Sequence, residues 1–273
     1  MLINCFRYWS GSGLATEPRL SSKWLINIAW FNSIISLPVP TESFLLKRDS
    51  IGKEYQPYPP PLQVCLDNIV PPVWPKTFIT KGLQGTSPLV QRSTALCLVQ
   101  VLEKYDAVLQ AFREAESALE EDKESGQWKL RRKDIEREIR KRVPNFEVII
   151  AFSQQKSTSL QWGADLSAEA SERMFRSAMI SESALRLMWA YHHFLPDVPS
   201  EARYDVGKLL LNDAVQRLSS NTSSKIAKEV AGFDSLSVLH ILRLLQHSDQ
   251  FVWTSTLGKQ RSFLELPFYR WSF

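Results

Sequence analysis

The sequence contains few of the residues from which covalent or metal-based sites are built. Its 273 residues include three cysteines, at positions 5, 65 and 97, and four histidines. An odd number of widely spaced cysteines fits neither a disulfide framework nor a zinc-binding pair. We therefore expect no metal, no cofactor and no disulfide, which is typical of a protein that works in a reducing compartment such as the cytosol or nucleus.

Long apolar runs are also missing. The segment from Trp24 to Leu37 is apolar but short, and Asn27, Asn32 and Ser33 interrupt it. A membrane-spanning helix needs about 20 predominantly apolar residues, so this segment predicts a buried helix instead. The first 13 residues do not follow the pattern of a secretory signal. We therefore expect no association with a membrane.

No arrangement of residues typical of catalysis is present, and the sequence has no glycine-rich phosphate-binding motif. His192 and His193 are adjacent, so on a helix they point about 100° apart and cannot easily share a metal. His240 and His247 have no acidic or cysteine residue at a spacing that would complete a site. Cys97 lies among apolar residues and is interpreted as a buried side chain. We predict that the chain is not an enzyme and takes no small-molecule substrate.

Proline and hydroxyl residues divide the sequence into predicted helices. Ser21 or Ser22 can cap the first, Ser87 before Pro88 marks the start of the longest, and Asp234 or Ser235 is expected to cap the last. Residues 38–61 contain six prolines and predict an extended loop. Because no stretch alternates in polarity with the period of a strand, we expect an all-α fold, an irregular armadillo- or HEAT-like helical repeat. The other helices are expected at residues 62–69, 75–83, 127–143, 145–155, 169–179, 181–195 and 200–219.

The most informative local feature is a predicted antiparallel hairpin of two charged helices, at residues 88–122 and 127–143. The apolar residues of the first helix follow a heptad spacing, and a turn at residues 123–126 pairs the two seams. In that register the one charged residue of each seam, Glu116 and Arg132, meets the opposite charge. We expect this pair to fix the alignment of the helices. The other predicted layers are Leu119 with Trp128, Phe112 with Ile135, Leu109 with Ile139 and Tyr105 with Val143.

The second helix of the hairpin is strongly basic, although the net charge of the chain is only +4, which alone does not predict nucleic-acid binding. Arg131, Arg132 and Arg142 flank the seam, where the acidic first helix can neutralise them. The remaining cations are predicted to point outward and could touch RNA phosphates or an acidic partner. They are Lys133, Arg137, Arg140 and Lys141. The alternative is a solvated hairpin whose charges pair only with one another.

Seven segments resemble the N-terminal region of the nucleolar pre-ribosomal-associated protein 1 family, in its fungal form. The resemblance covers about residues 24–257, and the number and order of the segments carry it rather than any single motif. The segments are ISLPVPT (35–41), YPPPL (58–62), KGLQGTSPLVQ (81–91), AFREAESALEED (111–122), VPNFEVIIAF (143–152), EARYDVGKLL (201–210) and LHILRLLQHSDQFVW (239–253).

The resemblance implies a non-catalytic helical-repeat scaffold of the nucleolus that acts in early maturation of the large (60S) ribosomal subunit, including rRNA processing. The implied partners are pre-ribosomal RNA and ribosome-assembly proteins, among them an RNA helicase. The alternative is a general helical-repeat adaptor that binds proteins and has no RNA role. An enzyme with a dispersed site is the least favoured interpretation.

The chain also departs from the family pattern. Family members are much longer, and residues 1–20 and 258–273 do not match. We therefore expect a partial helical domain at residues 21–257, with an irregular N-terminal segment at 1–20 and a C-terminal tail at 258–273 that are not native to it. On this interpretation the chain is a fragment, or a truncated gene model, of a longer protein.

Overall fold

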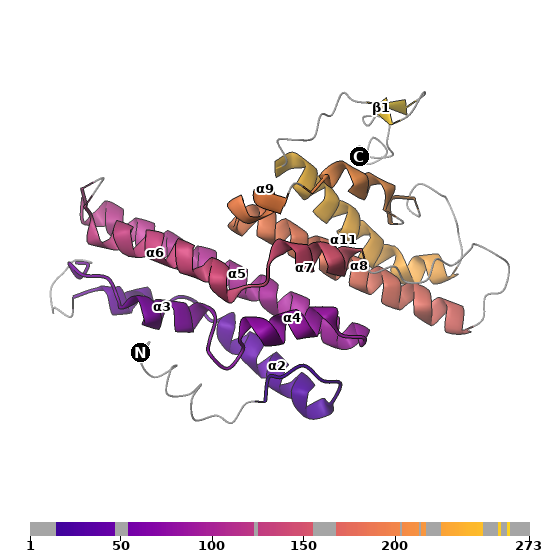
Figure 1. Cartoon of the computed structure of the whole chain (residues 1–273), viewed down its shortest axis with the longest axis horizontal. Coiled ribbons are helices and arrows are strands. Elements are labelled where there is room, and N and C mark those ends of the chain that lie inside the picture. Colours follow the sequence, from indigo (N-terminus) through magenta and orange to yellow (C-terminus); the bar gives the residue numbers. More distant parts are fainter. Residues whose placement is uncertain are drawn as a thin grey trace. The chain divides into compact units, whose positions relative to one another are not determined.

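The computed structural model describes residues 15–46, 54–122, 125–154, 168–202, 204–212, 214–216, 225–247, 256–257 and 261–262. Within these ranges the fold is helical apart from two strands of two residues each, which confirms the predicted all-α class. The chain forms two compact units, Met1–Phe152 and Ser153–Phe273 (Figure 1). The helical domain expected at residues 21–257 spans parts of both. None of the described helices combines the length and the apolarity needed to cross a membrane.

Unit 1 is built around one long helix, α5 (Pro88–Ala118). The 3₁₀ helix η1 (Thr41–Phe44) and α7 (Phe146–Ser153) complete this part of the chain. Figure 1 shows α6 running alongside α5 for most of its own length. The helices that pack against α5 are α2 (Ser22–Ile35), α3 (Leu62–Ile69), α4 (Lys76–Gln84) and α6 (Gln127–Arg142).

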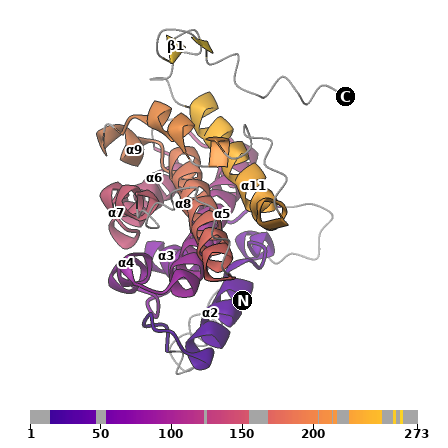
Figure 2. The ribbon, with the colours of Figure 1, turned by 90° about the vertical axis from the view of Figure 1, so that its right-hand side faces the viewer.

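Unit 2 centres on two long helices that pack against each other, α8 (Ala168–Phe194) and α11 (Lys225–His247) (Figure 2). The short α9 (Asp197–Ala202) packs against α8, and the 3₁₀ helix η2 (Val206–Leu211) packs against α11. The strands β1 (Thr256–Leu257) and β2 (Arg261–Ser262) form an antiparallel ladder, in which Thr256 pairs with Ser262.

The helix ends in unit 1 follow the prediction only in part. The hydroxyl of Ser21 caps α2 by accepting a hydrogen bond from the backbone N of Trp24 (3.2 Å). α5 starts where predicted, with Ser87 at the N-cap position and Pro88 at the first helical position, but the side chain of Ser87 makes no capping hydrogen bond. α5 ends at Ala118 rather than near residue 122, since Glu120 adopts a φ of 48°, a left-handed conformation that ends a helix.

In unit 2 three predictions are wrong. Residues 169–179 and 181–195 form the single helix α8, because no proline or glycine separates them. The helix expected at 200–219 is interrupted: α9 ends at Ala202, η2 follows, and residues 214–216 are helical. The break occurs because the carboxylate of Asp205 accepts a hydrogen bond from the backbone N of Gly207 (3.0 Å) and starts a new turn. Neither Asp234 nor Ser235 caps the last helix, because α11 begins at Lys225 and Asp234 lies buried in its middle.

Candidate interface on the α5–α6 hairpin

The predicted ion pair between Glu116 and Arg132 forms between α5 and α6. Nε of Arg132 donates to Oε1 of Glu116 (2.6 Å), and Nη2 donates to Oε2 (3.1 Å). Both side chains are only 16% exposed, and the hydrogen bonds that Arg132 donates to Glu116 raise the pKa of Arg132. Two parallel bonds fix the relative position and rotation of the two groups, so the pair holds the helices in one register.

The apolar layers around this pair are buried, as the predicted register requires. Only the layer nearest the turn differs, because α5 ends before Leu119, which is half-buried just past the helix. The ring of Trp128 packs instead on Phe112, with ring centroids 5.0 Å apart. The buried seam residues are Tyr105, Leu109, Phe112, Trp128, Ile135, Ile139 and Val143.

The proline-rich segment supplies the remaining contacts of Trp128. Residues 38–61 were predicted to be an extended loop, but Gln56 N donates to Phe44 O (2.8 Å) and Leu45 forms an isolated bridge with Tyr55. This fold places the rings of Phe44 and Tyr55 against Trp128, with centroids 5.2 and 6.4 Å away. The indole Nε1 of Trp128 donates to Gln56 O (2.9 Å). The segment therefore braces the turn end of the hairpin.

A carboxylate caps the start of α6. Oε1 of Glu121 accepts a hydrogen bond from the backbone N of Trp128 (3.0 Å), and Oε2 accepts one from the backbone N of Lys129 (3.2 Å). The residue at the N-cap position, Gly126, has no side chain that could accept these bonds. The negative charge also lies at the positive end of the helix dipole. The sequence showed only an acidic cluster here, without this role.

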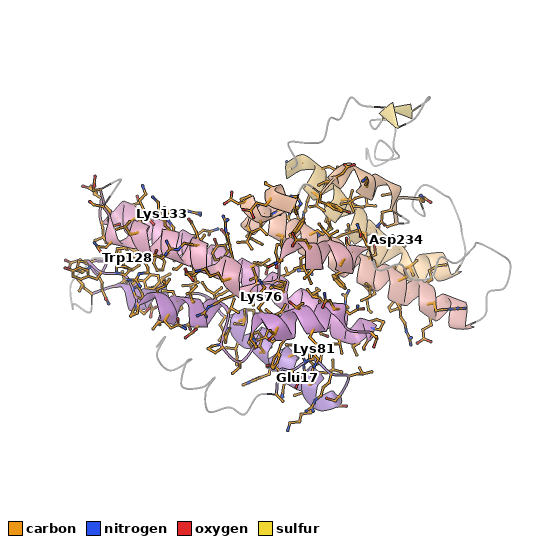
Figure 3. The ribbon with its side chains drawn as sticks, in the orientation of Figure 1. Glu17, Lys76, Lys81, Trp128, Lys133 and Asp234 are labelled. Atoms are coloured by element: carbon orange, nitrogen blue, oxygen red, sulfur yellow. The ribbon has the colours of Figure 1, made fainter. Side chains whose placement is uncertain are left out.

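All four cations predicted to point outward from α6 are exposed: Lys133, Arg137, Arg140 and Lys141. They lie on the side of the helix away from its buried residues Trp128, Ile135 and Ile139. Figure 3 shows Lys133 and Trp128 on opposite sides of α6. The hairpin thus presents a basic surface, defined here as the basic face of α6.

Carboxylates of the same helix partly neutralise the basic face. Arg137 Nη2 lies 2.7 Å from Asp134 Oδ1, and Lys141 Nζ lies 2.8 Å from Glu138 Oε1. The hydrogen bond from Lys141 lowers the pKa of Glu138, and the bond to Glu138 raises the pKa of Arg137. Within the described part of the chain Lys133 makes no ion pair. Exposed pairs of this kind contribute about 0–1 kcal/mol, so a phosphate can displace them.

Arg142 differs from its predicted role. It was expected to be neutralised by the acidic first helix, but its Nη1 donates to Asp67 Oδ1 (2.7 Å) and to Val70 O (3.1 Å). The acidic residues of α5 at this end of the hairpin, Glu103 and Asp106, instead accept hydrogen bonds from glutamine side chains of their own helix. Asp67 is 3% exposed, so this bond ties α6 firmly to α3.

Sequence reasoning missed a buried polar cluster between α8 and α11. His240 Nε2 lies 3.6 Å from Glu182 Oε1, and both side chains are at most 5% exposed. Asp234 and Ser237 are buried on the same helix as His240. From the sequence, His240 was considered only as a metal ligand, and this acidic neighbour was not predicted, because Glu182 comes from another helix. Asp234, Ser237 and Ile241 follow one another at a spacing of three and four residues, which places them on one face of a helix. This spacing could have predicted that polar side chains lie on the buried face of α11.

Neither a search for metal-binding residues nor a comparison with known proteins identifies a further site. In the described ranges, no three His, Cys, Asp or Glu side chains lie where they could hold a metal ion. Compared with known proteins, the chain matches no family model, no curated protein and no solved structure.

Proposed function

We propose that the chain is a non-catalytic scaffold segment in early nucleolar maturation of the large ribosomal subunit. In this proposal it contacts pre-ribosomal RNA and assembly proteins, including an RNA helicase, and its helices belong to an armadillo- or HEAT-like repeat. The seven family-like segments support the ribosomal role. The observation that supports an RNA contact is the basic face of α6, four exposed cations on one side of a braced hairpin.

The arrangement of these cations suits a nucleic-acid backbone. Positions 133, 137, 140 and 141 form one stripe along the helix, about 12 Å long at 1.5 Å per residue. Such a stripe can meet several phosphates of one strand, and the release of their counterions favours binding. α6 carries eight cations against three carboxylates, so its charge stays positive after internal pairing. The Glu116–Arg132 pair fixes the register of α6 against α5, and the Glu121 cap stabilises its first turn.

The salt dependence of RNA binding tests this proposal. The wild-type chain and a variant with Lys133→Gln, Arg137→Gln, Arg140→Gln and Lys141→Gln are titrated with a single-stranded segment of pre-ribosomal RNA at several salt concentrations. Each lost phosphate contact lowers the slope of log K against log salt by about 0.7. We expect the variant to lose roughly two to three units of slope and to bind more weakly.

A matched control replaces four exposed cations elsewhere in unit 1 with glutamine: Arg19, Lys23, Lys81 and Arg113. This control has the same net charge as the test variant, so a loss confined to the α6 variant identifies the surface. If both variants bind RNA equally, or the wild type does not bind, the RNA contact is wrong. Salt-insensitive binding of an assembly protein in that case supports the protein adaptor.

A further inference from the structure

Lys76, the first residue of α4, carries a charge that is not neutralised by any residue that the structure describes. Its Nζ donates a hydrogen bond to Oδ1 of Asn145 (2.7 Å), which belongs to a neutral amide. It forms no ion pair with a described carboxylate. The other cation of α4 differs, because Lys81 Nζ lies 2.5 Å from Oε1 of Glu17. The ammonium of Lys76 can therefore bind an anion without first giving up an acidic partner.

Two contacts place this ammonium at the end of α6. Arg142 is the last residue of that helix, and Asn145 follows it closely in the chain. Nη1 of Arg142 also donates to Val70 O (3.1 Å), in the segment that leads to the start of α4. Figure 3 shows Lys133 toward the turn of the hairpin and Lys76 beyond the other end of α6. Lys76 thus lies where the basic face of α6 ends.

The cations of the basic face lead toward this point. Lys133, Arg137 and Lys141 follow one another every four residues, about 6 Å apart along the helix axis. Lys141 lies in the last turn of α6. From there to Asn145 the chain can span at most about 14 Å. The next phosphates of a strand that is bound at Lys141 can therefore reach Lys76.

We propose that the RNA-binding surface continues from α6 onto α4, so that one single strand of RNA contacts both Lys141 and Lys76. This inference rests on the proposed function, because the strand is the RNA that the basic face of α6 binds. A phosphate that binds at Arg137 or Lys141 must displace the carboxylate of Glu138, which pairs with both. At Lys76 the phosphate meets an ammonium whose charge is still available and whose position is fixed by its amide partner.

A single strand suits this path better than a duplex. The cations lie in a row on α6, and the path then passes to a second helix. A single strand can bend to follow such a path, whereas the phosphates of an A-form duplex keep a fixed helical arrangement. Contacts between ammonium groups and phosphates carry no sequence information directly. We therefore expect Lys76 to add affinity without adding a preference for particular bases.

The salt dependence of RNA binding by a Lys76→Gln variant of the whole chain tests this contact. The wild type and the variant are titrated with a single strand of about 12 nucleotides of pre-ribosomal RNA. Loss of one phosphate contact should lower the slope of log K against log salt by about 0.7 and weaken binding about fivefold at 0.1 M salt. Asn145→Asp should weaken binding at least as much, because it places a carboxylate against Lys76. Circular dichroism establishes that both variants are folded.

Lys81→Gln is the matched control, since it removes the same charge from the same helix at a lysine that already pairs with Glu17. This variant should bind RNA as the wild type does. If Lys76→Gln keeps the wild-type slope while the four-glutamine variant of α6 loses slope, the extension onto α4 is wrong and the contact at α6 stands. A wild-type chain that binds no RNA overturns both proposals. Tighter binding of a duplex of the same length overturns the single-stranded path.

Discussion

Arg132 donates hydrogen bonds to two carboxylates, Glu116 across the hairpin and Glu136 one turn further along α6 (2.9 Å). Replacing it by an acid would leave Glu116 facing a like charge in a half-buried layer. Arg132→Glu should therefore lower the free energy of unfolding by about 3 kcal/mol. Adding Glu116→Arg restores a pair of opposite charges and should recover about half of the loss. Urea denaturation of the two variants measures both effects.

The exposed Lys133 gives the control for this cycle. Lys133→Glu introduces the same charge on the same helix, outside the seam, and should change the free energy of unfolding by less than about 0.5 kcal/mol. A double variant as unstable as Arg132→Glu alone would mean that the pair does not set the register.

The thiols of Cys65 and Cys97 should not react with alkylating reagents in the folded chain. Burial raises the pKa of Cys65 to about 12 and that of Cys97 well above its ordinary value. Because the thiolate is the reactive form, iodoacetamide at pH 8 should leave both unmodified until guanidinium unfolds the chain. Peptide mass spectrometry distinguishes them from Cys5, which lies outside the described residues. Labelling of the native chain at the unfolded rate would contradict this burial.

At the residue scale the sequence predicts some pairs and not others. Glu116 and Arg132 could be predicted because each interrupts an apolar seam at a matching position. The partners of Arg142 and His240 could not, because Asp67 and Glu182 come from helices that are distant in sequence. Such contacts follow from tertiary packing, which local spacing does not encode.

Among the elements, α4 and α5 approach closely at Gly82. A Cβ atom at this position would lie 2.8 Å from Cγ2 and 3.1 Å from Cβ of Thr94, and both residues are in helices that cannot easily move. Gly82→Ala should lower the free energy of unfolding by about 2 kcal/mol. In α11 a Cβ at Gly232 would meet no atom within 4 Å. Gly232→Ala should therefore stabilise the chain by about 0.5–1 kcal/mol. Thermal unfolding compares the two, and equal effects would mean that α4 and α5 are not in close contact.

The start of α6 depends on a residue outside that helix. Glu121→Ala removes both hydrogen bonds to the first turn and should cost about 1 kcal/mol of stability. Glu114→Ala removes the same charge from an exposed site on α5 and should have little effect. Urea denaturation compares the variants. If Glu114→Ala costs as much, general charge repulsion rather than capping determines the stability.

Predictability at the element scale follows the strength of local signals. The buried line of α2 and both helices of the hairpin repeat apolar residues at 3–4 spacing, and the structure confirms them. In unit 2 the predicted helix ends were wrong, because polar residues inside α8 and α11 were interpreted as helix ends. The bracing of Trp128 by Phe44 and Tyr55 has no local signal at all.

For the whole molecule, the proposed RNA contact belongs to unit 1, where the basic face of α6 lies. Because binding to phosphates releases their counterions, RNA binding by this face should weaken steeply with salt. We therefore expect RNA binding to be lost at 500 mM salt. Sedimentation of the chain with and without RNA at low and high salt measures this. Binding that is unchanged at 500 mM salt would contradict a phosphate contact.

The ribosomal role is the central claim, and neither the net charge nor the fold class predicts it. It is based on the seven family-like segments. It is tested most directly by crosslinking the tagged protein to RNA in cells, with the four-glutamine variant of the basic face compared under the same conditions. We expect the wild-type protein to recover precursors of the large-subunit rRNA and the variant to recover clearly less. Recovery no greater than from untagged cells, or equal recovery by both proteins, would contradict the account.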